Sequence, residues 1–290
     1  MTVVNVGKVR VPGATLHYET RGSGPLLLLI PGGAGDAGLF EGMADRLAAA
    51  GYTVVSYDQR GLSRSPLDGP LADQRVGERS ADAARLLDLL SPDAPAYVFG
   101  SSSGGIVALD LLARHPGRVR RVVAHEPPLV ELLPDPAPYR EHFAEVRRLL
   151  RTKGIGAAMT RFAQAPGQAP DGPDREQPRS RELPPSVRPM ASRMATNMPV
   201  FLEHVLCPFS SSAPDLDGLR AAAGKLVLGV GRESGGQEAL VGPARRLAEL
   251  TGAVTVEFPG GHVGCVEHPE EFAELLIRTL AAEEVTATRP

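Results

Sequence analysis

The segment from Ala96 to Gly105 constrains the fold more than any other part of the sequence. An apolar stretch, Ala96 to Phe99, runs directly into Gly100-x-Ser102-x-Gly104 and then into a helical pattern. Such a turn holds its central residue in a strained backbone conformation. Only small residues two positions before and after it let strand and helix pass so closely. The pattern therefore predicts a nucleophile elbow, with Ser102 Oγ exposed above the edge of a sheet.

Length and charge limit the class of protein and of partner. With 290 residues and 42% hydrophobic content, the chain can form one large α/β domain or two ordinary ones with a substantial core. The net charge of −3 comes from scattered acids and bases, which leaves no concentrated basic face for nucleic acid or an anionic membrane. We expect a small-molecule substrate, no nucleic-acid or membrane partner, and a monomer or homodimer.

Cysteine usage and the N-terminus bear on the compartment. The chain has two cysteines, Cys207 and Cys265, and a protein of this size does not depend on a single disulfide, so a reducing cytoplasm is expected. Residues 1–5 lack a basic start followed by an apolar run. The longest apolar run, Leu26 to Ile30, is too short to span a bilayer. No cofactor or metal ion is expected.

Apolar strand-like segments alternate with helical segments over most of the chain. After an edge hairpin at Val9 to Glu19, the predicted strands are Leu26 to Ile30, Tyr52 to Tyr57, Ala96 to Phe99, Val119 to Ala124, Lys225 to Gly231 and Val254 to Phe258. Runs that are apolar at every position are typical of strands covered by helices on both faces. The order predicts an α/β fold with a mostly parallel sheet and helices on both faces.

The alternation stops from Pro127 to about Pro214. This stretch contains no convincing strand, has helical patterns such as Tyr139 to Arg151, and is crowded with proline, glycine and charge at about 165–185. We expect a helical cap at 128–212 with a flexible proline-rich loop at about 165–185. The core domain would then comprise 1–127 and 213–290.

With these features in place, the chain resembles the α/β-hydrolase family with a cap domain over nearly its whole length. The resemblance rests on Pro31-Gly32-Gly33-Ala34-Gly35, Asp58-x-Arg60-Gly61-x-Ser63-x-Ser65, the Gly100-x-Ser102-x-Gly104 elbow and the late Gly261-His262. In the family the first position of the first loop is usually histidine, and here it is Pro31. The hydrogen bonds that anchor this loop therefore stay open at the level of sequence.

A serine nucleophile needs a base to accept its proton and a third group to orient that base. The base is expected to be His262, which lies in a glycine-flanked loop after the last strand and follows serine and acid in the family's chain order. His125 follows the strand that ends at Ala124 and is the weaker alternative, because it precedes the preferred acid. Serine at position 102, in place of aspartate, disfavours epoxide hydrolase and haloalkane dehalogenase chemistry.

Two carboxylates compete for the role of the triad acid. Glu233 follows the seventh strand, where the family most often has an aspartate, and is preferred. Glu126 follows the sixth strand, where some members have the acid, and two prolines hold its loop rigidly. Asp215 and Asp217 are the remaining candidates.

The resemblance also implies two backbone donors for the oxyanion of a tetrahedral intermediate. These are the N–H of Ser103, which opens the helix after the elbow, and the N–H of Gly33, with Ala34 as a substitute for Gly33. In the cap, Met190, Met194 and Met198 are spaced by four on one face of a helix that Pro199 is expected to end. Together with Ala34 they are candidates for an adaptable apolar pocket wall, and lid packing is the alternative.

These features predict a serine hydrolase that cleaves an ester or lactone of a small, largely apolar substrate through an acyl-enzyme. The same residues would also serve C–C bond hydrolysis or acyl transfer. A different class, a non-hydrolytic binding protein on the same fold, is the other alternative.

Overall fold

The computed structural model describes residues 2–164 and 188–282. Within these residues the chain forms one eight-stranded sheet with the strand order β1-β2-β4-β3-β5-β6-β7-β8. β2 pairs antiparallel with β1 and β4, and the remaining neighbours pair parallel. The mostly parallel α/β sheet predicted from sequence is confirmed.

The strands from β3 onward lie close to the segments predicted from sequence, whereas the edge hairpin extends beyond the predicted Val9 to Glu19 at both ends. The strands are β1 (Asn5–Val11), β2 (Ala14–Arg21), β3 (Leu26–Ile30), β4 (Thr53–Tyr57), β5 (Ala96–Ser101), β6 (Val119–His125), β7 (Leu226–Gly231) and β8 (Val254–Phe258).

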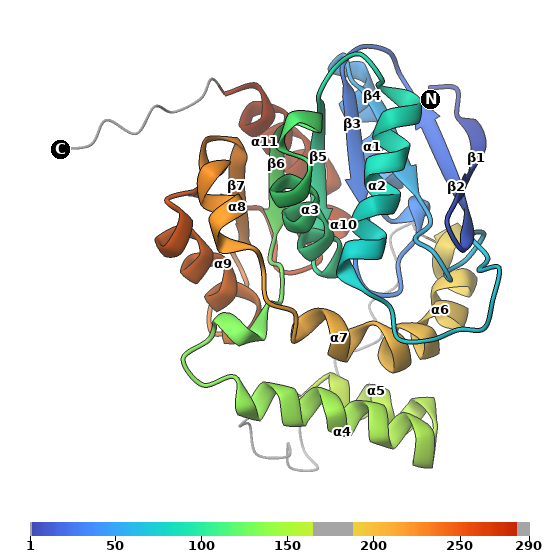
Figure 1. Cartoon of the computed structure of the whole chain (residues 1–290), viewed down its shortest axis with the longest axis vertical. Coiled ribbons are helices and arrows are strands. Elements are labelled where there is room, and N and C mark those ends of the chain that lie inside the picture. Colours follow the sequence, from blue (N-terminus) through green and yellow to red (C-terminus); the bar gives the residue numbers. More distant parts are fainter. Residues whose placement is uncertain (1, 165–187, 283–290) are drawn as a thin grey trace.

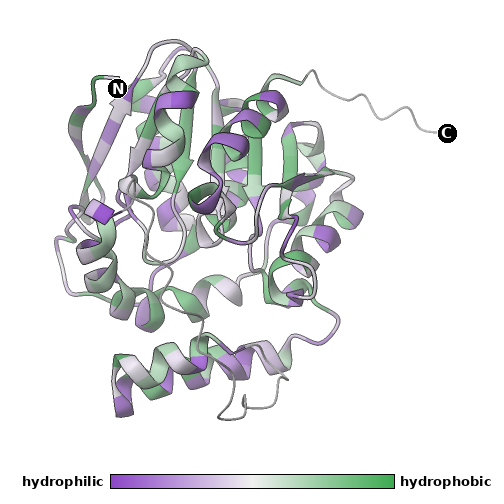
Figure 2. Cartoon of the chain, turned by 180° about the vertical axis from the view of Figure 1, so that it is seen from behind, coloured by the Kyte–Doolittle hydropathy of each residue, from purple (hydrophilic) through white to green (hydrophobic). Residues whose placement is uncertain are grey.

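Helices cover both faces of the sheet, and each face has its own apolar core. One core contains side chains of α2 (Val76–Leu90), α3 (Ser103–Arg114) and α9 (Glu238–Thr251). The other contains side chains of α1 (Glu41–Ala49) and α11 (Pro269–Ala281). Figure 2 shows the hydrophobic strands between these helices. Because β4, β3, β5, β6, β7 and β8 are parallel, their carboxyl ends lie at one edge of the sheet.

Strand β3 illustrates why its sequence shows no polar alternation. Successive side chains of a strand point to opposite faces. Leu26, Leu28 and Ile30 belong to one core, whereas Leu27 and Leu29 belong to the other. Because both faces are buried, every position of the strand is apolar.

The described residues between β6 and β7 contain helices and no strand. Four of these helices, α4 (Ala137–Lys153), α5 (Ile155–Phe162), α6 (Ala191–His204) and α7 (Leu206–Ser210), are called the inserted helices below. Figure 1 shows α4, α5 and α7 below the sheet. The proline-rich loop expected at about 165–185 lies outside the described residues.

Shorter helices complete the described chain. They are α8 (Leu216–Ala221), α10 (Gly264–Glu267) and the 3₁₀ helices η1 (Ala37–Phe40), η2 (Pro116–Arg118), η3 (Val130–Leu132), η4 (Arg188–Met190) and η5 (Ala223–Lys225). Among the described helices, none is both long enough and apolar enough to cross a membrane.

The expected end of a helix at Pro199 is wrong. Helix α6 passes through Pro199 and continues to His204. A proline inside a helix removes its own backbone donor and strains the turn before it. Phe201 and Leu202 lie beyond the proline and are buried against the core, so we attribute the continuation of the helix to this packing.

The elbow glycines should be intolerant of any side chain. A Cβ at Gly104 would lie 2.2 Å from the carbonyl oxygen of Ile30, and the backbone cannot move without disturbing β3. We expect Gly104→Ala to lower the free energy of unfolding by about 1–3 kcal/mol, the usual cost of overpacking. Denaturant unfolding at equilibrium measures this change.

Gly117→Ala is the matched control, because a Cβ at Gly117 meets no atom within 4 Å. This variant should unfold like the unmodified protein. Equal stability of the two variants would contradict the steric account of the elbow.

Candidate active site

Ser102 occupies a strained turn between β5 and α3. Its backbone has φ 55° and ψ −126°, in a region that non-glycine residues rarely adopt. Its N–H donates to the carbonyl oxygen of His125 over 2.9 Å. A Cβ at Gly100 would lie 2.3 Å from Gly104 O, so both flanking glycines are required sterically. The side chain of Ser102 is half-buried.

His262 and Glu126 form a hydrogen-bonded pair at the same edge of the sheet. His262 Nδ1 lies 2.8 Å from Glu126 Oε2. The other carboxylate oxygen accepts the N–H of Gly231 at the end of β7 over 2.7 Å. Glu126 is fully buried and has φ 45°, which turns the chain sharply after β6.

The charge state of Glu126 determines the tautomer of His262. Burial raises the pKa of the Glu126 carboxyl, but the hydrogen bond from His262, together with the positive charge that His125 and His262 carry when protonated, outweighs burial and lowers the pKa to about 2. An ionised carboxylate can only accept hydrogen bonds, so Nδ1 of His262 carries a proton. In the neutral imidazole, Nε2 is then free to accept one.

The preference for Glu233 as the acid is corrected by this geometry. Glu233 is exposed, and its backbone N–H donates to Gly260 O over 2.9 Å. Among the described residues, no hydrogen bond joins the Glu233 carboxylate to His262. The loop after β7 directs this side chain to solvent, and the partner of His262 is Glu126, the alternative named from sequence. Asp215 instead caps α8 by accepting the N–H of Gly218, and Asp217 pairs with Arg220.

Ser102 and His262 both lie at the carboxyl edge of the sheet, after β5 and β8. Among the described residues no hydrogen bond joins Ser102 Oγ to His262. Catalytic hydrogen bonds are often long before substrate binds and tighten in the complex.

His125 is a buried neutral imidazole rather than a base. It is fully buried and makes edge-to-face contacts with Phe258 and Phe272. Burial lowers its pKa to about 4, against the opposite effect of Glu126. Its ring packs among these aromatic side chains. Its backbone carbonyl accepts the hydrogen bond from the N–H of Ser102.

Residues 31–35, which we call the glycine loop, lie directly beside the elbow. A Cβ at Gly32 would lie 2.7 Å from Ser102 Cβ. Gly33 has φ 56°, and the space on its Cβ side is open to 4 Å. Its N–H donates to Ser103 Oγ over 2.9 Å. The N–H of Ser103 belongs to the first turn of α3, where donors have no partner within the helix.

Sequence reasoning missed two side chains that hold the glycine loop. Gln59 Nε2 donates to Pro31 O, and Asn197 Nδ2 donates to Ala34 O over 3.0 Å. These contacts bridge 28 and 163 positions of the chain. No local pattern marks either residue as a partner of the loop.

The three methionines do not share one environment. Met190 belongs to η4, is 2% exposed, and lies close to Gly38 of η1. Met194 and Met198 are partly buried and pack against the core of the α2–α3 face. Their expected role in a substrate pocket stays a prediction.

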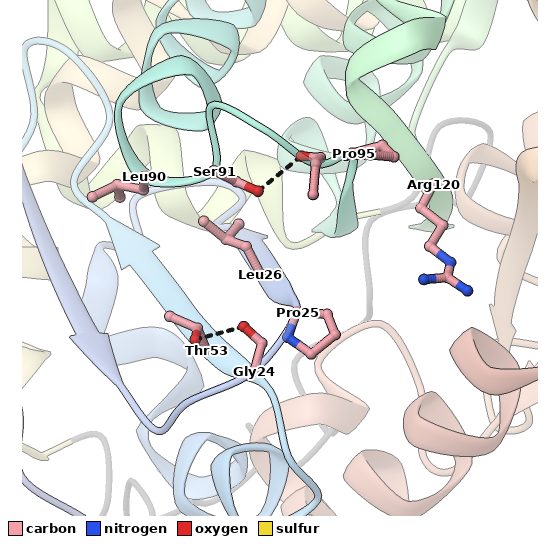
Figure 3. A pocket seen from close by; sticks show the side chains of 9 residues that line it. Gly24, Pro25, Leu26, Thr53, Leu90, Ser91, Pro95 and Arg120 are labelled. Atoms are coloured by element: carbon pink, nitrogen blue, oxygen red, sulfur yellow. Dashed lines mark hydrogen bonds between the residues drawn. The ribbon is translucent and has the colours of Figure 1, made fainter.

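A cavity at the opposite edge of the sheet is separate from these residues. It has a volume of about 240 Å³ and is lined by Pro25, Leu26, Thr53, Leu90 and Arg120, among others. Figure 3 shows Pro25, Leu26 and Thr53 at the amino ends of β3 and β4, with Leu90 at the end of α2 and Arg120 in β6. The described residues contain no group of three His, Cys, Asp or Glu side chains arranged to hold a metal ion.

Comparison with known families and relatives agrees with this architecture. A sequence model described as the alpha/beta hydrolase fold matches residues 25–199. The hydrolase YraK of Bacillus subtilis (strain 168) is 36% identical over 284 residues, which cover 97% of each chain. A zearalenone hydrolase of Bionectria ochroleuca is 25% identical over 278 residues, covering 92% of this chain and 94% of the relative.

Among solved structures, the enol-lactonase from Burkholderia xenovorans LB400 superposes with a TM-score of 0.63 at 20% identity. The match covers 95% of this chain and all of the other (100%). At this identity the likeness concerns the fold alone.

The buried His125 should make stability depend on pH. Its folded-state pKa is depressed, so the unfolded chain binds a proton between pH 6.5 and about 4 that the folded chain does not. Stability should therefore fall on acidification through this window, by on the order of 3 kcal/mol from this group. His125→Phe, which keeps an aromatic ring, should lose this part of the pH dependence in denaturant unfolding.

His142, whose pKa is also lowered to about 4 by burial and by Arg161, is present in both proteins and cancels in the comparison. If the two proteins lose stability in parallel from pH 6.5 to 4, the account of His125 is wrong.

Proposed function

The chain belongs to the α/β-hydrolase fold family, and on that basis we propose that it is a serine hydrolase that cleaves a carboxylic ester or lactone. The proposal rests on one observation above all: the strained Ser102 shares a sheet edge with the hydrogen-bonded pair of His262 and Glu126. The hydrolases among the relatives support an enzyme rather than a binding protein.

In the first step, Ser102 Oγ attacks the carbonyl carbon of the substrate. His262 Nε2 accepts the hydroxyl proton, and the ionised Glu126 keeps the hydrogen bond to Nδ1–H and stabilises the imidazolium. Because the pKa of Glu126 is lowered to about 2, the carboxylate stays ionised throughout. The imidazolium then returns its proton to the leaving alkoxide.

The tetrahedral intermediate carries a negative oxygen that needs fixed donors. The N–H groups of Ser103 and Gly33 are proposed for this role. In the substrate-free protein the Gly33 donor is satisfied by Ser103 Oγ, so the oxyanion would take the place of this hydroxyl. In the second half of the reaction, His262 activates a water that hydrolyses the acyl-enzyme.

The substrate is proposed to be small and largely apolar. The partly buried Met194 and Met198 support this assignment, because methionine adapts to irregular apolar shapes.

Ser102→Ala should abolish hydrolysis of an activated short-chain ester, with a fall in kcat on the order of 10⁶-fold. It should also abolish covalent labelling by a fluorophosphonate, read as a mass shift of the intact protein. Ser211→Ala, at an exposed serine after α7, should react like the unmodified protein. Hydrolysis that survives in Ser102→Ala would contradict the serine mechanism.

Glu126→Gln should lower kcat by about 10⁴-fold, because an amide facing Nδ1 stabilises the wrong tautomer of His262. Glu233→Gln changes an exposed carboxylate and should leave kcat within about twofold of the unmodified enzyme. Steady-state kinetics on the same ester compare the two. A large loss in Glu233→Gln alone would restore the assignment made from sequence.

A further inference from the structure

The glycine loop is held by partners from three separate elements. Gln59, after β4, donates to Pro31 O, and Ser103 Oγ at the start of α3 accepts the N–H of Gly33. The third partner is Asn197 of α6, which donates to Ala34 O over 3.0 Å. Because the oxyanion would displace Ser103 Oγ from Gly33, Gln59 and Asn197 are the side chains that hold the loop during the reaction.

Asn197 is buried, and its amide is fully engaged. It is 2% exposed. Besides Ala34 O, its Nδ2 donates to Ser63 Oγ over 2.8 Å, and its Oδ1 accepts the N–H of Ser63 over 2.8 Å. Because the N–H of Ser63 can only donate, it requires the amide oxygen on its side and so directs Nδ2 toward the glycine loop.

One turn earlier on the same helix, Arg193 fixes α6 to the residue that follows the loop. Its guanidinium donates from Nη2 to Asp36 Oδ1 over 3.1 Å and from Nε to Oδ2. Asp36 is fully buried and also accepts the Ser63 hydroxyl over 2.8 Å. The helix is thus tied to the core at two adjacent points, one of them the loop itself.

A glycine-rich loop needs such anchors because its peptide planes rotate easily. Oxyanion donors accelerate a reaction only when they are fixed before charge develops. The N–H of Gly33 lies in the peptide plane of the Gly32 carbonyl, which accepts the N–H of Gly35 over 3.0 Å. The carbonyls of Pro31 and Ala34 belong to the next peptide planes outward, and anchoring them limits how far this turn can shift around Gly33. The donor of Gly33 therefore depends on a contact with an inserted helix.

We propose that Asn197 is a positioning residue for the oxyanion hole, so that α6 sets the reaction rate through the Ala34 carbonyl. This inference rests on the proposed serine-hydrolase function. It predicts that losing the amide impairs stabilisation of the transition state while leaving ground-state binding of the substrate nearly intact.

The test uses Asn197→Ala in the full-length protein, with kcat expressed per fluorophosphonate-reactive site. We expect kcat to fall about 10- to 100-fold, less than the 10²- to 10³-fold loss of a direct donor, with KM within about twofold. The inhibition constant of a trifluoromethyl ketone, whose adduct places an oxyanion in the hole, should rise by the same factor as kcat/KM falls.

Two control variants separate positioning from stability. Leu202→Ala removes a buried apolar side chain of the same helix, which cannot form a hydrogen bond to the loop, and it should lower stability without changing the inhibition constant. Thr196→Ala, at an exposed neighbour, should change neither. Asn197→Ser is the second variant if the alanine protein does not fold, since its hydroxyl is too short to reach Ala34 and should give the same loss.

The outcomes are distinct. If either Asn197 variant keeps kcat per reactive site and the inhibition constant within twofold of the unmodified protein, the positioning role is wrong. The same conclusion follows if Leu202→Ala weakens the inhibitor equally. If the unmodified protein is not labelled at Ser102 at all, the proposed function fails instead.

Discussion

The buried carboxylate of Glu126 is the group on which the geometry of the candidate active site depends. It follows β6, accepts the N–H of Gly231 at the end of β7, and bonds His262 in the loop after β8. A carboxylate removed from water is costly unless hydrogen bonds and charges replace its hydration. Its two partners supply that replacement, so the ends of three adjacent strands are held together by one side chain.

Backbone strain at the carboxyl edge of the sheet has a common pattern. Ser63, Ser102 and Glu126 are the non-glycine residues with positive φ in the described chain, and they follow β4, β5 and β6. Each is restrained through its own N–H, by Asn197 Oδ1, His125 O and Gly229 O respectively. Strained conformations persist where surrounding contacts over-determine them. The strain is therefore concentrated where side chains must project above the sheet.

The inserted helix α6 carries two kinds of side chain at the carboxyl edge of the sheet. Met194 and Met198 are its candidates for contact with substrate, whereas Arg193 and Asn197 bind the core. These residues alternate along the same turns of the helix. Substitutions in α6 that adapt it to another substrate would thus have to preserve the buried amide of Asn197. On the proposed assignment, the same helix would contact the substrate and anchor the glycine loop.

The sequence by itself determined the strands, their parallel order and the glycine-flanked positions of Ser102 and His262. Those features follow from short-range patterns: runs of apolar residues buried on both faces, and glycines that relieve local steric conflict. Only the tertiary structure decided which carboxylate meets His262 and what anchors the glycine loop. These pairs are 136 and 163 positions apart. Glu126 and Glu233 both follow strands of the same edge, and only the turn of the backbone at Glu126 directs its side chain inward.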